Sequence, residues 1–246
     1  MAVDIPETRH NNAPGPNGFA NDPRMAVTVT MTPPPAIDPL YIDDTLLILD
    51  KPSGLLAVPG RGPDKADCLS ARVQIRYPDA LIVHRLDMAT SGLMVMARGP
   101  ATQRALSMAF AARAVKKRYI ALVAGRLEAP PEGWGLIDLP LVGDWPNRPR
   151  QVVDYQLGKP SLTRWRVLSH DESGAWTRVE LEPVTGRSHQ LRVHLRELGH
   201  PILGDDLYAP PEVRDLAQRL LLHAAWLSFA HPVTGTRLVF ERPAPF

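Results

Sequence analysis

Short apolar stretches, many of them alternating with polar positions, recur along residues 45–240 and predict β-strands more often than helices. The expected strands cover residues 45–49, 81–84, 93–97, 118–123, 163–168, 176–181, 220–229 and 237–240. Longer amphipathic stretches predict three helices, at residues 66–77, 100–113 and 188–198. The strands outnumber the helices and do not alternate regularly with them, which favours an α+β fold over a doubly wound parallel sheet.

The ends of two expected helices carry recognisable signals. Pro100 stands in a first turn, where proline is tolerated, and Gly199 follows the third helix as a terminating glycine. We expect Ser188 to cap that helix and its leucines, at 191, 195 and 198, to face the core. The opposite face is then expected to be polar and solvated; it carries His189, Arg192 and Arg196.

Residues 1–38 differ in composition from the rest of the chain. They contain the Pro33-Pro34-Pro35 run and further scattered prolines, few aromatics and no period of two or 3.6. We therefore predict a disordered extension at residues 1–38 and one folded domain at residues 39–246.

Composition then narrows the class of protein. Of 246 residues, 44% are apolar and 22% charged, and the longest apolar stretches fall short of the ~18 residues of a membrane span, so a soluble globular protein is expected. The single cysteine, Cys68, excludes an internal disulfide and a zinc site of several thiolates. With no recognisable secretion signal, we expect a cytoplasmic protein.

The basic residues are mostly arginine. Only five of the 28 are lysines, and the formal net charge is +2. Arginine pairs bidentately with phosphate and stacks on bases, which favours an acidic polymer as partner. A GC-rich coding sequence also produces excess arginine, so composition alone leaves both explanations open.

Several familiar chemistries find no motif. There is no phosphate-binding glycine-rich loop, no Gly-x-Ser-x-Gly element and no His-Glu-x-x-His pair. His189 and His194 are five residues apart, which does not place two ligands on one helical face. We expect no metal site and no nucleotide cofactor.

Three segments could carry chemistry. Residues 84–92 must turn the chain between two strands, which places Asp87 on a strand-end loop, although a lone Asp in a turn is by default a cap. Residues 186–196 gather cations on one helix face, by default a solvated one. Residues 115–123 place cations beside Tyr119, a pairing that suits nucleic acid but also protects an edge strand from aggregation.

Together these segments resemble the RluA family of RNA pseudouridine synthases. His-Arg-Leu-Asp-x-x-Thr-Ser-Gly stands at residues 84–92, Lys-Lys-x-Tyr at 116–119 and Gly-Arg-x-His-Gln-Leu-Arg-x-His at 186–194. Shorter matches lie at 51–55, 144–149, 199–205 and 221–224. The resemblance implies a mixed, mainly antiparallel sheet with flanking helices and a central catalytic cleft, isomerisation of uridine in RNA, and no cofactor.

It also implies roles for single residues. Asp87 matches the catalytic aspartate, Tyr119 the active-site tyrosine, and Arg192 the arginine that pairs with the aspartate and keeps it ionised under a buried base. Arg85 matches the arginine that enters the RNA stack, Leu222 is an expected apolar wall, and His84 is expected to support the loop. The expected phosphate contacts are Lys116, Lys117, Arg118, Arg148, Arg150 and Arg187.

Residues 88–89 and 144–149 are most similar to family members that act on 23S rRNA and on the tRNA anticodon arm, so stem-loops of both are the expected substrates of a monomeric enzyme. An rRNA-only or tRNA-only synthase and a non-catalytic RNA-binding or RNA-folding factor stay open as alternatives. A glycoside hydrolase would need two carboxylates. Asp138, Glu180 and Glu182 are available, but the two glutamates alternate with apolar residues and are expected to face solvent.

Overall fold

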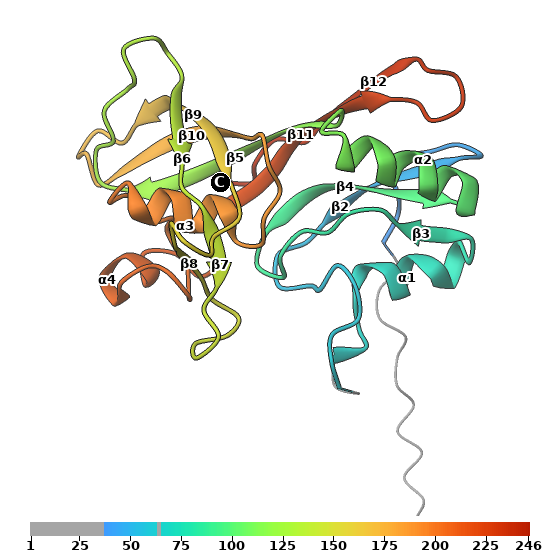
Figure 1. The fold of residues 1–246 in the computed structure, drawn as a ribbon, viewed down its shortest axis with the longest axis horizontal. Coiled ribbons are helices and arrows are strands. Elements are labelled where there is room, and N and C mark those ends of the chain that lie inside the picture. Colours follow the sequence, from blue (N-terminus) through green and yellow to red (C-terminus); the bar gives the residue numbers. More distant parts are fainter. Residues whose placement is uncertain (1–36, 63–64) are drawn as a thin grey trace, which may run out of the picture. The chain divides into compact units, whose positions relative to one another are not determined.

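The computed structural model describes residues 37–62 and 65–246 (Figure 1). Residues 1–36, nearly all of the predicted Pro-rich extension, lie outside the described residues, and the disorder predicted there stays a prediction. Within the described ranges, none of the helices has the length and apolar character needed to cross a membrane.

One mixed sheet organises the described chain. Its ten strands are β1 (Tyr41–Ile42), β2 (Leu46–Lys51), β3 (Ala80–Ile82), β4 (Ser91–Arg98), β5 (Lys116–Ala124), β6 (Gly135–Asp138), β9 (Leu162–His170), β10 (Trp176–Pro183), β11 (Leu222–Ala230) and β12 (Arg237–Glu241). The order is β1-β2-β4-β11-β5-β10-β9-β6, with β3 on β4 and β12 on β11. β7 (Leu141–Gly143) and β8 (Gln151–Val153) form a separate hairpin. The helices are α1 (Leu69–Arg76), α2 (Pro100–Ala111), α3 (Gln190–Glu197) and α4 (Pro211–Arg214).

The predicted α+β class with a mainly antiparallel sheet is confirmed. Every predicted strand and helix has a counterpart, with ends shifted by a few residues. The sequence analysis missed β1, β6, β7, β8 and α4, which are two to four residues long. Elements this short do not complete enough of a hydrophobic period to be recognised.

β2 and β4 are buried on both faces because α1 and α2 cover opposite sides of them (Figure 1). Leu47 of β2 belongs to one core cluster with Val73 of α1, whereas its neighbours Leu46 and Ile48 belong to another with Leu106 of α2. Successive side chains of a strand point to opposite faces, so an uninterrupted apolar strand needs a covering layer on each side.

The parallel pairing of β4 with β11 depends on a glycine. Gly92 has φ +112°, and a Cβ built on it would lie 2.4 Å from the carbonyl oxygen of Ala224. Glycine adopts this positive φ without steric cost, and a larger residue would meet the backbone of Ala224. This close approach brings the loop before β4 against the start of β11, in the middle of the sheet.

The third helix differs from its prediction in two ways. α3 begins at Gln190 after His189, whose φ is 54°, and Ser188 does not cap it. Its polar face is not solvated, because residues 190–195 are all buried. Leu191 packs on the sheet, and Val193 packs on the other side against Leu141 and Tyr208. The prediction that the leucines of this helix face the core was therefore right, but other residues also cover the opposite face of α3.

Candidate active site

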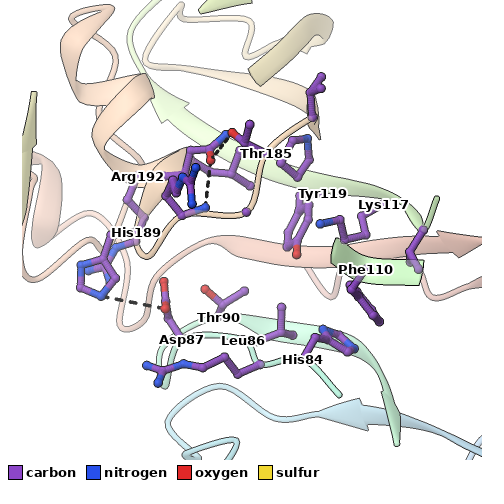
Figure 2. A pocket seen from close by; sticks show the side chains of 18 of the residues that line it. His84, Leu86, Asp87, Thr90, Phe110, Lys117, Tyr119, Thr185, His189 and Arg192 are labelled. Atoms are coloured by element: carbon purple, nitrogen blue, oxygen red, sulfur yellow. Dashed lines mark hydrogen bonds and ion pairs between the residues drawn. The ribbon is translucent and has the colours of Figure 1, made fainter. Parts of the chain in front are cut away.

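Asp87 lies on the loop that joins β3 to β4, as predicted, and its side chain faces a cavity of about 580 Å³ (Figure 2). The loop is closed by a hydrogen bond from the Thr90 N–H to the Asp87 carbonyl at 3.1 Å, and Thr90 is itself buried. The Asp87 side chain keeps 21% of its surface exposed. The carboxylate is therefore shielded by the fold but reachable from the cavity.

Four segments far apart in the sequence form the cavity: the loop after β3, the end of α2 with β5, residues 183–192, and the start of β11. Of the residues singled out from the sequence, the cavity is lined by His84, Arg85, Asp87, Lys117, Tyr119, Arg187, Arg192 and Leu222. Among its described lining residues, Asp87 is the only carboxylate. The cavity thus holds one acid among many cations.

The remaining predicted phosphate contacts do not line it. Lys116 and Arg118 point to the other face of β5, because side chains alternate along a strand and Lys117 and Tyr119 take the cavity face. Arg118 instead pairs with Glu180 at 3.8 Å and Glu182 at 3.7 Å. Arg148 and Arg150 lie in the exposed 144–150 loop, where Arg148 covers the ring of Trp145.

The ion pairs that Glu180 and Glu182 form with arginines also bear on the alternative of a glycoside hydrolase, which needs two carboxylates. Glu180 accepts a hydrogen bond from Nε of Arg166 at 2.6 Å, and Glu182 lies 3.4 Å from Arg164. Neither glutamate lines the cavity with Asp87, and neither does Asp138. The geometry therefore gives a glycoside hydrolase no second acid.

Tyr119 of β5 lies across the cavity from the Asp87 loop (Figure 2). Leu222, from the adjacent strand β11, also lines the cavity. Burial raises the pKa of Tyr119, and the negative charge of Asp87 raises it further. The Tyr119 hydroxyl therefore keeps its proton at neutral pH and can donate a hydrogen bond, while the ring of the same side chain offers a flat apolar surface.

His84 supports the loop from behind. Its Nε2 accepts a hydrogen bond from the Val95 N–H at 3.0 Å, and its ring stacks on Phe110 with centroids 4.5 Å apart. Burial lowers the pKa of His84 to about 3, and the nearby Lys117 contributes in the same direction. A neutral imidazole held by one hydrogen bond and one stacking contact is suited to positioning the loop.

Lys51 fastens the same loop on its other side. Its ammonium donates to the carbonyls of Pro52 at 2.8 Å, Leu55 at 2.7 Å and Met88 at 3.0 Å, and it is fully buried. Burial lowers the pKa of Lys51 to about 8, against the opposing effect of Asp87. A buried cation therefore stands behind the residue next to Asp87.

The expected ion pair between Arg192 and Asp87 is not formed. The Arg192 guanidinium binds Asp205 at 2.8 and 2.6 Å and Asp206 at 3.0 Å, and no contact within 4.0 Å joins it to Asp87 among the described residues. The reason is that Asp205 and Asp206 lie against α3 and accept the hydrogen bonds of the Arg192 guanidinium. Arg192 still lines the cavity, and its positive charge is felt there at longer range.

The cation-forming group nearest Asp87 is one that the sequence analysis did not select. Nε2 of His189 lies 3.9 Å from Oδ1 of Asp87 (Figure 2). Burial lowers the pKa of His189, and Asp87 opposes that effect. His189 belongs to the 186–194 motif, but it was placed on a solvated helix face, since its left-handed backbone cannot be recognised from the sequence.

The mixed sheet and a cavity that holds one loop carboxylate, a tyrosine and several cations are the features expected of an enzyme with an acidic substrate such as RNA. No group of three metal-ligating side chains occurs in the described part of the chain. Comparison with known proteins agrees with this class. Residues 45–197 match the RNA pseudouridylate synthase family.

Individual relatives extend the match over most of the chain. The "Dual-specificity RNA pseudouridine synthase RluA" of Escherichia coli (strain K12) is 51% identical over 207 residues, 84% of this chain and 93% of that protein. The Yersinia pestis protein of the same name is 52% identical and covered to 98%. The structure of "Human RNA Pseudouridylate Synthase Domain Containing 1" superposes with a TM-score of 0.71 at 30% identity, covering 88% of this chain and 87% of that one. The chain belongs to the RNA pseudouridylate synthase family and is an isomerase acting on RNA.

Proposed function

We propose that this enzyme isomerises specific uridines in stem-loops of both 23S rRNA and the tRNA anticodon arm, with Asp87 as the catalytic carboxylate. The relatives at 51% and 52% identity, covered almost to their full length, are named dual-specificity enzymes. The single observation that carries the catalytic assignment is that Asp87 is the one acid among the described lining residues of a cavity otherwise rich in cations.

The reaction breaks the bond from N1 of uracil to C1′ of ribose, rotates the base and forms a bond from C5 to C1′; the C5 proton is lost and N1 gains one. No electrons are gained or lost, so no redox partner is required. Asp87 serves either as nucleophile at C1′ or as base toward the sugar. Both routes require an ionised carboxylate, and arginines line the same cavity.

The uridine must leave the RNA stack before it can reach the cavity, at a cost of a few kcal/mol that is smallest in a loop. We assign Arg85, exposed beside Asp87, to the space that the base leaves. Tyr119 and Leu222 would flank the extruded uracil, and Lys117 and Arg187 would hold phosphates at the rim.

We further propose that the enzyme works as a monomer in the cytoplasm without a cofactor. The chain's single cysteine is buried as a free thiol, which agrees with a reducing compartment. The substrates proposed for it, rRNA and tRNA, are cytoplasmic in bacteria.

Purified enzyme incubated with two synthetic stem-loops, one from each RNA, tests this function by nucleoside analysis. We expect pseudouridine in both with the unaltered enzyme and with Asp67→Asn, a control that changes an exposed carboxylate. We expect none with Asp87→Asn, although RNA binding should persist. Product in only one of the two RNAs would refute dual specificity. If the unaltered protein bound RNA but gave no product, it would instead be an RNA-binding factor.

A further inference from the structure

His189 is held between the catalytic loop and a tyrosine that no motif singled out. Its Nε2 lies 3.9 Å from Asp87 Oδ1, and its Nδ1 lies 2.7 Å from the hydroxyl of Tyr208, whose ring meets it edge-on. Only 12% of the His189 side chain is exposed. The imidazole therefore has one nitrogen committed to Tyr208 and the other directed at the carboxylate.

The hydrogen bonds of Tyr208 bear on which ring nitrogen of His189 carries the proton. The Tyr208 oxygen accepts a hydrogen bond from the backbone N–H of Gln151 at 2.8 Å. Among the described residues, the other partner of that hydroxyl is Nδ1 of His189, and we assign the phenolic hydrogen to that bond. A neutral His189 then carries its hydrogen on Nε2, the nitrogen that faces Asp87.

Tyr208 is in turn fixed by the buried ion pair of Arg192. Oδ1 of Asp205 accepts hydrogen bonds from the N–H groups of Leu207 and Tyr208, each at 3.0 Å, while Arg192 holds the same carboxylate. A chain of contacts through Asp205, Tyr208 and His189 therefore joins Arg192 to Asp87, in addition to the longer-range effect of its charge.

The backbone of His189 is also constrained. A φ of 54° is unusual for a residue other than glycine, although histidine and asparagine tolerate it better than most. Gln190 holds the turn in place, because its Oε1 accepts hydrogen bonds from the Arg187 N–H and the Thr185 hydroxyl. Such a conformation persists only where its surroundings determine it, and it aims the ring at the cavity.

We propose that His189, fixed by Tyr208 with its hydrogen on Nε2, is a positioning residue that donates a hydrogen bond to Asp87 and orients the carboxylate toward the ribose once RNA is bound. The present separation is about 1 Å longer than a hydrogen bond, and such contacts commonly tighten in the substrate complex. The proposal rests on the catalytic role proposed for Asp87. The charged groups that influence His189 are Asp87, Arg192, Asp205 and Arg85.

Burial lowers the pKa of His189, so the ring is neutral at physiological pH. A neutral Nε2–H still donates to a carboxylate, and the proposed role does not need an imidazolium. The role therefore differs from the arginine pairing expected from the sequence, which relied on a permanent charge.

Three variants test the proposal under single-turnover and steady-state conditions with one stem-loop. Tyr208→Phe removes the hydroxyl, and His189→Asn keeps a residue that tolerates the left-handed backbone but is too short to reach Asp87. His189→Gln restores an N–H at about the original reach. Tyr155→Phe, at a tyrosine that is 77% exposed, is the matched control.

We expect Tyr208→Phe and His189→Asn to lower kcat roughly tenfold to a hundredfold with KM within about twofold, and His189→Gln to recover part of that loss. The melting temperature of His189→Asn should stay near that of the unaltered enzyme. Unchanged kcat in His189→Asn, or a rise in KM alone, would overturn the proposal. If the unaltered enzyme makes no pseudouridine, or Asp87→Asn still does, the proposed function fails instead.

Discussion

At the scale of single residues, burial decides which side chains of the site change charge. His84, His189 and Lys117 all lose part of their tendency to be protonated because the fold removes them from water. Tyr119 keeps its proton for the same reason. Arginines also line the cavity with Asp87, and their charge does not change near neutral pH, which suits a site that must attract RNA.

His84 gives a pH dependence with a definite sign. In the unfolded chain a histidine takes up a proton below about pH 6.5, whereas folded His84 does so only near pH 3. The contribution of neutral His84 to the free energy of unfolding is therefore fully present above pH 6.5. It is lost as the pH falls toward 3, by about 1.4 kcal/mol per pH unit. Protonation would also break the bond that Nε2 accepts from Val95.

Urea unfolding at pH 7, 6 and 5 measures this effect. We expect the free energy of unfolding to fall with pH in the unaltered protein and to fall less steeply in His84→Asn. The other buried histidines, His194 and His223 among them, keep part of the slope in both. Identical slopes for the two proteins would show that His84 is not held neutral.

At the scale of elements, the site depends on the contact between β4 and β11. The parallel pairing places Ser91 opposite His223, with the Ser91 hydroxyl 2.9 Å from Nδ1 of His223 and accepting from Arg219 at 2.6 Å. Leu222, one residue earlier on β11, then lines the cavity next to the Asp87 loop. A local change in this contact should therefore alter the site and the stability together.

Gly92→Ala tests that dependence. The added methyl group would meet the backbone of Ala224, and the alanine would have to adopt a positive φ. We therefore expect the free energy of unfolding to fall by at least about 2 kcal/mol. Gly174→Ala is the matched control, because Gly174 also has a positive φ but has open space around its Cβ position. Equal losses in the two variants would mean that backbone strain alone, and not the close approach, matters at Gly92.

At the scale of the whole molecule, the sequence sufficed for features that depend on nearby residues. The turn formers between two apolar runs placed Asp87 on a strand-end loop. The sequence analysis grouped Lys116, Lys117 and Arg118 as phosphate contacts, although only Lys117 lines the cavity. The motif order indicated the family, which the comparisons confirm.

Features that depend on distant segments could not be predicted in the same way. The polar face of α3 reads as solvated because nothing near Arg192 in the sequence shows that Asp205 will cover it. Tyr208, which holds Nδ1 of His189, likewise comes from a segment distant in the sequence. Long-range packing thus places His189, and not Arg192, nearest to Asp87 among the described residues, while the catalytic role of Asp87 stays a proposal.

The most direct measurement maps pseudouridine in total RNA from cells that carry the gene, lack it, or carry it as Asp87→Asn. The account predicts pseudouridine at discrete sites in 23S rRNA and in tRNA that disappears in the second and third strains alike. Sites that persist with Asp87→Asn at their normal level would contradict the account, because the reaction would then proceed without the one carboxylate that lines the cavity among the described residues.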